Sequence, residues 1–334
     1  MANLTKLFPA VFSLLLHGGG EPPASTLPPP HVPAVTVHRC LPPAVRLSGA
    51  GGERTALVVD VEGALLRSSR SLFPYFMLVA VEAGSFLRGL MLLLLYPVIS
   101  LLAGDVAVRA MAAVAFCGLR ESQFRAGRAV LPRWLLEDVG KEALDAVTRR
   151  SSPATGRRTT TTVVWASSMP RVMVEPFLKE YLTPPDEAAG GGVVVAAREM
   201  KVVWGFYTGL LEDGGEVASS PEVRRAMAGV DDVVGLSGGS MDLLRSPLVS
   251  FCKEVYVVSG EEKSKWRPLQ RREYPRPLVF HDGRLAFLPT PLAAAAMLVW
   301  LPFGAALAAA RIAVALALPY RYATLLLAAT GQCV

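Results

Sequence analysis

The strongest constraint on this chain is a long stretch without charge near its end. Positions Leu285 to Ala310 hold 26 consecutive residues without a charged side chain, and the apolar character continues beyond Arg311 to Pro319. About 20 apolar residues suffice for a helix to span a bilayer, whereas one segment of a soluble core rarely needs so many. The sequence therefore predicts a membrane segment or hairpin within residues 284–334.

Pro302 and Gly304 lie in the middle of this stretch, where both residues weaken a helix. A reversal there would give a helical hairpin with two legs, each shorter than a full span. Both flanks carry arginines: Arg271, Arg272, Arg276 and Arg284 before the segment, and Arg311 and Arg321 after it. Because basic flanks prefer the cytosol, we predict a hairpin with both ends on the cytosolic side.

The overall composition agrees with a protein that meets lipid. Of its 334 residues, 52% are hydrophobic and 19% are charged, where a soluble domain carries roughly 25% charged residues. The net charge of +6 is not arranged as a basic run interleaved with aromatic residues, which excludes a nucleic-acid channel. We therefore expect membrane lipids as the partner. A cluster of Arg267, Arg271, Arg272 and Arg276 is a candidate for contact with anionic headgroups, the alternative being a solvated face.

The first part of the chain differs from the rest. An apolar segment from Leu7 to Leu16 precedes a proline-dense stretch, Glu21 to Ala44, which is typical of an extended spacer. We assign residues 1–46 to this segment and linker, and residues 47–283 to the first folded domain.

Apolar, β-branched runs within residues 47–283 predict the strands of a parallel sheet. These runs are Thr55 to Asp60, Thr161 to Ser167, Val193 to Ala197, Met200 to Tyr207 and Asp232 to Leu236. Helical patterns at Leu131 to Val147 and Val172 to Leu182 alternate with them, which indicates an α/β fold. An apolar helical insertion, about residues 73–148, follows the first strand. Its uncharged part, Gly89 to Ala103, is too short to span, so we expect a re-entrant or in-plane helix, or else a buried helix pair.

Several polar residues follow these strands at the edge of the sheet where ligands gather. Asp60 ends the first strand and Glu62 comes two residues later; Ser167 ends the second, and Asp242 follows a later strand. This order resembles haloacid dehalogenase-like hydrolases, in which an aspartate attacks phosphorus and a carboxylate two residues on moves the proton. Mg²⁺ would then be held by Asp60 and Asp242. The alternative reading of Asp60 is a cap for the next turn.

Three departures from that pattern predict a vestigial site. Ala64 stands where the hydrolases carry a threonine, and Gly238 stands where they carry the first metal-binding aspartate. A charge-neutralising lysine is also not evident, because none lies between Lys201 and Asp242. We expect Asp60, Glu62, Ser167 and Asp242 to be relics, and Mg²⁺ as a cofactor only if the hydrolase-like site functions.

Three longer segments resemble one family. Phe73 to Ile99, Met169 to Leu182 and Tyr274 to Gly304 closely resemble the land-plant glycerol-3-phosphate acyltransferases of the cutin and suberin type. The resemblance implies a haloacid dehalogenase-like, Rossmann-like domain facing the cytosol, followed by membrane helices at the endoplasmic reticulum. It also implies an acyltransferase domain that moves acyl groups from coenzyme A thioesters to glycerol 3-phosphate.

The acyl-transfer reaction in this family depends on a histidine followed five residues later by an aspartate, the histidine acting as general base. The residues at that spacing from His17, His31, His38 and His281 are Pro22, Thr36, Pro43 and Ala286. We therefore expect this chain to cover the N-terminal half of such an enzyme and to be inactive alone. The alternatives are a non-catalytic membrane-bound interaction module and a weak phosphatase of the haloacid dehalogenase type.

Overall fold

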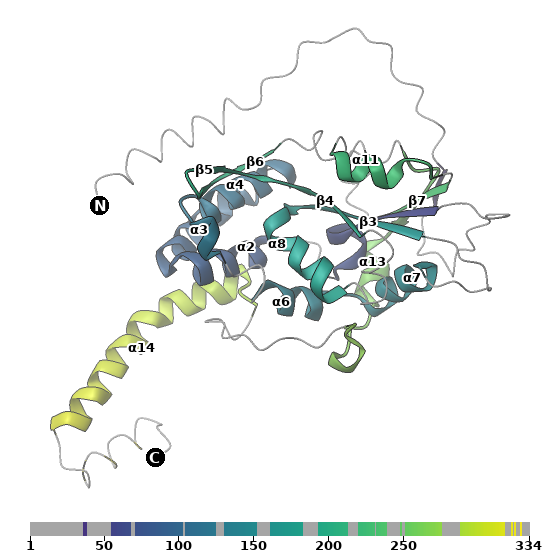
Figure 1. Ribbon diagram of the computed structural model, residues 1–334. Helices are drawn as coiled ribbons and strands as arrows, with labels where there is room; N and C mark the ends of the chain where they lie inside the picture. Colours follow the sequence, from purple (N-terminus) through teal and green to yellow (C-terminus); the bar gives the residue numbers. More distant parts are fainter. Residues whose placement is uncertain are drawn as a thin grey trace.

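A computed structural model shows how these segments are arranged (Figure 1). It describes residues 36–38, 55–67, 71–102, 104–124, 130–151, 161–182, 193–212, 220–230, 232–238, 248, 251–275 and 288–317, with 322, 324 and 328. His281 and Asp242 lie outside these residues.

A parallel sheet of six strands forms the centre of the domain, in the order β1-β8-β7-β2-β3-β4. The strands are β1 (Thr36–His38), β2 (Thr55–Asp60), β3 (Thr161–Pro170), β4 (Val194–Arg198), β7 (Asp232–Gly238) and β8 (Glu254–Val258). The predicted α/β fold with a parallel sheet is therefore confirmed. The strand predicted at residues 55–60 has the same bounds in the structure.

The sheet is covered on both faces, which explains why the middle of the central strand β2, residues 56–59, is entirely apolar. Leu57 and Val59 of β2 point into the larger core, and Ala56 and Val58 point into a smaller core on the opposite face. Helix α11 (Pro221–Met227) contributes Val223 to the smaller core. Helices α6 (Leu131–Asp138), α7 (Lys141–Ser151) and α8 (Arg171–Pro176) lie below the strands in Figure 1, with α8 continuing as a π-helical turn, Phe177–Leu182.

Strand β1 corrects the expectation that folding begins near residue 47. Thr36–His38 lie inside the proline-dense stretch, yet they pair in parallel with Glu254–Tyr256 of β8 at the edge of the sheet. The imidazole of His38 stacks on the ring of Tyr256 with 4.9 Å between centroids.

The predicted insertion after β2 is helical. It begins with α2 (Phe73–Val79) and a π-helical turn (Ala80–Gly84), then continues with α3 (Phe86–Ile99), α4 (Gly104–Phe116) and a 3₁₀ turn (Glu121–Gln123). All seven residues of α2 are buried. Helix α3 buries Gly89, Leu92 and Ile99 but leaves Leu94 69% exposed.

Two elements that the sequence predicted as continuous are each divided in the structure. The helix expected over residues 131–147 is divided into α6 and α7, since Val139 bridges to Leu66 and Gly140 to Pro268. The strand expected over residues 200–207 is a hairpin of β5 (Met200–Val203) and β6 (Phe206–Leu211), which form a separate antiparallel sheet. Its turn lies at Trp204, with φ +52°, and Gly205, with φ +76°.

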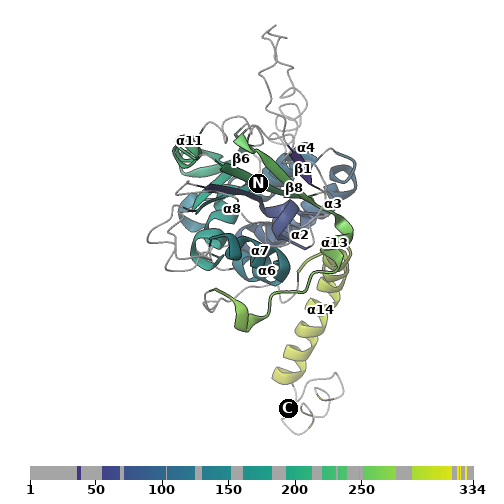
Figure 2. The same ribbon diagram turned by 90° about the vertical axis from the view of Figure 1, so that its right-hand side faces the viewer.

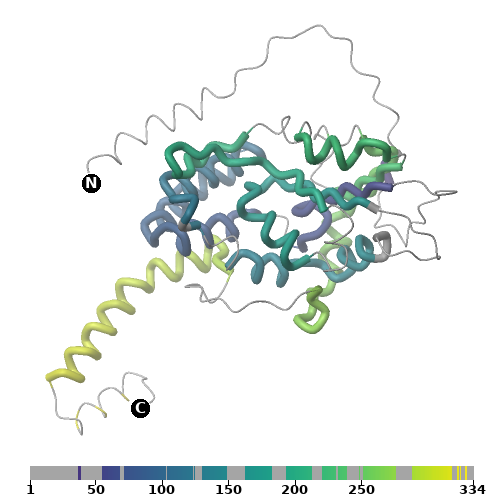
Figure 3. Tube along the Cα trace, viewed as in Figure 1, coloured from purple at the N-terminus to yellow at the C-terminus, as the bar shows by residue number. Residues whose placement is uncertain are grey.

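The last long element, α14 (Pro291–Ala317), leaves the domain as one projecting helix (Figure 2). The predicted hairpin is therefore wrong: the trace continues through Pro302 and Gly304 without reversing (Figure 3). A proline inside a membrane helix is tolerated, because only one amide donor is lost and local adjustments satisfy the freed carbonyl. The 27 residues give a length of about 40 Å, which is enough to span a bilayer.

Candidate functional site

The candidate site lies at the carboxyl edge of the sheet, where β2, β3 and β7 end side by side. Asp60 is the last residue of β2 and pairs in register with Ala166 of β3, so Ser167 follows next to it. Gly238 ends β7 on the other side of β2. The structure thus brings Asp60, Glu62 and Ser167 to one place, as their positions after the strands suggested, whereas Asp242 lies outside the described residues.

Asp60 is held by the turn that follows it. Its Oδ1 accepts a 2.8 Å hydrogen bond from the amide of Gly63, and the carboxylate caps the π-helical turn Val61–Leu65. Its Oδ2 lies 3.4 Å from both the hydroxyl of Ser237 and the amide of Gly238. Asp60 therefore caps the turn that follows it, as the alternative interpretation of this residue predicted.

Glu62 points toward the end of β3, where three donors converge on a single oxygen. Its Oε1 accepts hydrogen bonds from the hydroxyl of Ser167 at 2.5 Å and from the amides of Ser168 at 3.1 Å and Met169 at 3.2 Å. Burial and the nearby charge of Asp60 raise the pKa of Glu62 to about 7, although these hydrogen bonds act in the opposite direction.

A buried lysine completes the site, and the sequence analysis did not find it. Lys263 lies in α13 (Gly260–Ser264), directly after β8. Its ammonium donates to the carbonyls of Glu62 at 3.0 Å and Leu66 at 3.1 Å. Burial lowers the pKa of Lys263 to about 8, against attraction to Asp60, Asp138 and Glu62.

The short helix that carries Lys263 is fixed by a capping box. Ser259 accepts from the amide of Glu262, and the Glu262 carboxylate accepts from the amide of Ser259, both at 3.2 Å. The spacing Ser259 to Glu262 is a sequence signal for a helix start. This signal predicts where α13 begins, but it does not predict that the side chain of Lys263 is buried.

The described residues do not fit a Mg²⁺ ion. A Cβ atom on Gly238 would lie 2.4 Å from the carbonyl oxygen of Gly63, so no side chain fits at the position where the hydrolases carry a metal-binding aspartate. The backbone oxygen of Glu62 already accepts from the ammonium of Lys263. Within the described part of the chain, no group of three or more His, Cys, Asp or Glu side chains is arranged to hold a metal.

The arginine cluster proposed for lipid contact is partly paired with protein carboxylates. Arg267 makes a 3.2 Å ion pair with Glu142, and Arg271 lies 3.8 Å from Glu137. These contacts favour the solvated-face interpretation for both residues; Arg276 lies outside the described residues.

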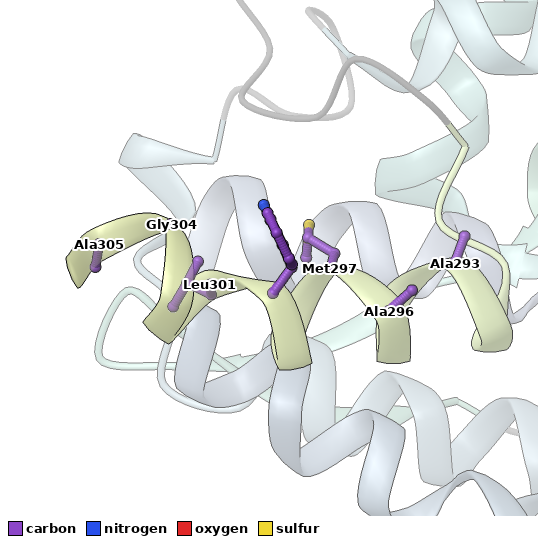
Figure 4. Close-up of a pocket in the computed structure, with 7 residues that line it drawn as sticks. Ala293, Ala296, Met297, Leu301, Gly304 and Ala305 are labelled. Atoms are coloured by element: carbon purple, nitrogen blue, oxygen red, sulfur yellow. The ribbon is translucent and has the colours of Figure 1, made fainter. Parts of the chain in front are cut away.

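The apolar face of α14 is the second candidate surface. Seven residues line a shallow hollow along it (Figure 4): Ala293, Ala296, Met297, Trp300, Leu301, Gly304 and Ala305. None of them is charged, and they repeat at intervals of three and four, so they share one side of the helix. This helix is long and apolar enough to cross a membrane.

Comparison with known proteins places these features in a family. Residues 56–258 match the family described as the HAD-like domain of RAM2-like glycerol-3-phosphate acyltransferases. Relatives include probable glycerol-3-phosphate acyltransferase 3 of Arabidopsis thaliana, which is 42% identical over 280 residues, covering 83% of this chain and 50% of the relative. Glycerol-3-phosphate acyltransferase RAM2 of Petunia hybrida is 33% identical over 268 residues, covering 78% of this chain and 51% of the relative.

Among solved structures, a phosphoserine phosphatase aligns with a TM-score of 0.35 and 12% identity, covering 64% of this chain and 91% of that chain. The chain spans about half the length of the acyltransferases that it matches. The match over residues 56–258 includes all but the first residue of strands β2 to β8, with Asp60, Glu62 and Ser167 of the site, and ends before Lys263. The chain therefore belongs to the RAM2-like glycerol-3-phosphate acyltransferase family and contains its HAD-like domain.

Proposed function

We propose that this chain provides the HAD-like, membrane-associated part of a glycerol-3-phosphate acyltransferase, and that its own hydrolase-like site does not hydrolyse phosphate. The substrates of the whole enzyme would be a coenzyme A thioester and glycerol 3-phosphate, used in making cutin-type lipids at the endoplasmic reticulum. The match of residues 56–258 to the family carries this proposal.

The close contact between Gly63 and Gly238 supports the second half of the proposal. Asp60, the residue that would attack phosphorus, is adjacent to this contact and accepts a hydrogen bond from the Gly63 amide. The close approach of Gly238 to Gly63 leaves no room for a metal-binding side chain at position 238, and the backbone oxygen of Glu62 already accepts from the ammonium of Lys263. We therefore propose that the domain works without Mg²⁺ and serves as a structural support.

Helix α14 is the main support for membrane association, and helix α3 is a second one. In α14, which is described throughout, only Ala294 is buried, and large side chains such as Trp300 and Phe303 are exposed. Helix α3 contacts α14 and exposes Leu87, Leu94 and Val98. Because exposed apolar surface of this extent is unfavourable in water, we propose that α14 spans the bilayer and α3 lies at its surface. We propose in addition that the sheet domain faces the cytosol, because the basic residues Arg267, Arg271 and Arg272 precede α14 on that side.

Carbonate extraction of microsomes that contain residues 1–334 tests the membrane proposal. The chain should stay in the pellet, and Leu301→Lys combined with Ala308→Lys in α14 should release most of it, since a lysine at the bilayer centre costs about 3 kcal/mol. Glu261→Lys on exposed α13 is the matched control and should not release it. Retention of the double variant would contradict an α14 span.

An incorporation assay tests the catalytic part of the proposal. Microsomes with residues 1–334 alone should incorporate no labelled glycerol 3-phosphate into lipid above background, because no histidine in this chain is followed by an aspartate five residues later. Microsomes with a full-length Arabidopsis relative serve as the positive control. Incorporation by the chain alone would show that it contains an unrecognised general base.

A further inference from the structure

The turn of the β5–β6 hairpin holds a tryptophan in an unfavourable conformation and almost entirely in solvent. The two turn residues, Trp204 and Gly205, have left-handed φ angles of +52° and +76°. Such a φ is costly for a bulky side chain, and Asn-Gly is the pair that two-residue turns of this kind prefer. Trp204 is also 96% exposed. Neither the turn conformation nor buried area therefore explains a tryptophan at this position.

The base of the hairpin, by contrast, is held firmly against the end of α4. Tyr207 is buried, and its amide donates to the carbonyl of Leu119 at 2.8 Å. The amide of Glu121 donates to the carbonyl of Gly205 at 3.0 Å, next to the turn itself. The exposed indole of Trp204 is thus presented on a fixed support.

This support belongs to the same end of the domain as the exposed side of α3 and the start of α14. Strand β6 packs on α4, α4 packs on α3, and α3 contacts α14. In Figure 1 the β5 end of the hairpin, α3 and the start of α14 lie toward the left of the domain. We propose that Trp204 is an anchor in the polar–apolar interface of the bilayer that α14 spans. The inference rests on the proposed membrane association and adds the hairpin turn to it as a third contact.

The chemistry of the turn favours lipid as its partner. Tryptophan combines a large apolar ring with one N–H donor, and it is enriched where a membrane meets water. Exposed Lys201 lies on β5, and exposed Arg120 places its guanidinium 5.4 Å from the ring centroid of Phe206, so two cations accompany the one carboxylate of Glu121. Cations in this position suit the phosphates of lipid headgroups.

The size of the exposed turn also favours lipid over another protein. Residues 201–206 are all exposed, and they form one short turn. A specific protein interface uses about 20 or more residues on each side. A bilayer sets no such minimum, because each apolar side chain that enters it gains free energy separately.

Quenching of tryptophan fluorescence by brominated lipid tests this position. The chain has five tryptophans, of which Trp134, Trp165 and Trp266 are buried, so Trp204 and Trp300 are the two that lipid can reach. The full chain with Trp300→Phe would be reconstituted into vesicles of phosphatidylcholine, with and without bromine on the acyl chains. Bromine should remove about one quarter of the emission, which is the share of one tryptophan among the remaining four.

The matched variant adds Trp204→Asn to Trp300→Phe. It should lose no emission to bromine, and its Tm in detergent should not fall, because asparagine tolerates a left-handed φ better than tryptophan does. Wild type compared with Trp300→Phe reports the insertion of α14 in the same vesicles. A failure of the proposed α14 span is thereby distinguished from a failure at Trp204.

Quenching of Trp300 without quenching of Trp204 would overturn the inference. Protection of Trp204 from aqueous iodide in that case would identify a protein contact, such as a second copy of the chain, in place of lipid. A lower Tm of the Trp204→Asn variant would also overturn the inference, since Trp204 would then support the fold and not the attachment to a membrane.

Discussion

At the carboxyl edge of the sheet, Asp60, Glu62 and Lys263 are buried and each is held by neighbouring groups, whereas along α3 and α14 large apolar side chains lie exposed. In the first region, the charged side chains and hydrogen-bond donors are already paired with one another within the fold. The second exposes mainly large apolar side chains and gains free energy by leaving water. Interaction with other molecules is therefore expected at the apolar end, although the sheet edge carries the residues that look catalytic.

The largest effect should come from forcing apart the backbones of Gly63 and Gly238 at the closed edge. Gly238→Ala would place a Cβ 2.4 Å from the Gly63 oxygen and 2.5 Å from its Cα, and neither backbone atom can move without shifting the turn that Asp60 caps. We expect a loss of at least about 3 kcal/mol in the free energy of unfolding, measured by denaturant titration. Gly260→Ala is the control, because a Cβ there meets no atom within 4 Å. Equal stability of the two variants would show that the edge is not closed.

The second effect concerns proton binding by Glu62. Its pKa is raised from 4.5 to about 7, so the stability contributed by the protonated form is complete below pH 4.5 and is lost as the pH rises through 7. Glu62→Gln cannot ionise and lacks this loss. Between pH 4 and pH 8 the wild type should lose up to about 3 kcal/mol relative to Glu62→Gln, measured by urea unfolding at each pH. Parallel pH profiles of the two proteins would contradict the burial of Glu62 beside Asp60.

A smaller loss is expected from removal of the internal cation. Lys263→Met preserves most of the side-chain volume but leaves the carbonyls of Glu62 and Leu66 without their donor. We expect a cost of about 2 kcal/mol in the free energy of unfolding. Lys265→Met, two residues further on at an exposed position, is the control and should change stability by less than about 0.5 kcal/mol. If both variants behave alike, Lys263 does not stabilise the site.

The smallest effect on the free energy of unfolding is expected in α3, where a fluorophore would report directly whether the side chain is in contact with lipid. Leu94 is 69% exposed, so Leu94→Cys should change the free energy of unfolding in detergent by less than about 0.5 kcal/mol. An environment-sensitive fluorophore attached there should shift to the blue in liposomes. The same label at Glu261→Cys, on exposed α13, should report water. Identical spectra at the two positions would contradict contact between α3 and lipid.

Local patterns predicted the elements whose contacts are regular, and distant contacts decided the rest. Strand β2 was found with its bounds because five consecutive apolar or β-branched residues, followed by Asp60, are buried on both faces of a sheet. The break between α6 and α7 depends on Leu66 and Pro268, which are far from Val139 and Gly140 in sequence. The hairpin predicted at Pro302 was wrong because proline lowers helix stability without requiring a reversal of the chain.

The candidate site shows the same division. Asp60, Glu62 and Ser167 were found because the ends of neighbouring parallel strands meet at one edge. Lys263 was missed because the hydrolase pattern places its lysine before Asp242, whereas this lysine comes after β8 and donates to the turn that follows β2. The closure by Gly63 and Gly238 depends on a backbone approach that no spacing reveals.

Hydrolysis of a phosphate ester tests the central claim, that the sheet edge is closed, most directly. Purified chain in detergent would be incubated with lysophosphatidate and Mg²⁺, and released phosphate would be measured against Asp60→Asn. A closed edge, with Gly63 and Gly238 in contact and the Glu62 carboxylate bonded to Ser167, predicts no release above the level of Asp60→Asn. Turnover by the wild type that Asp60→Asn abolishes would contradict the account.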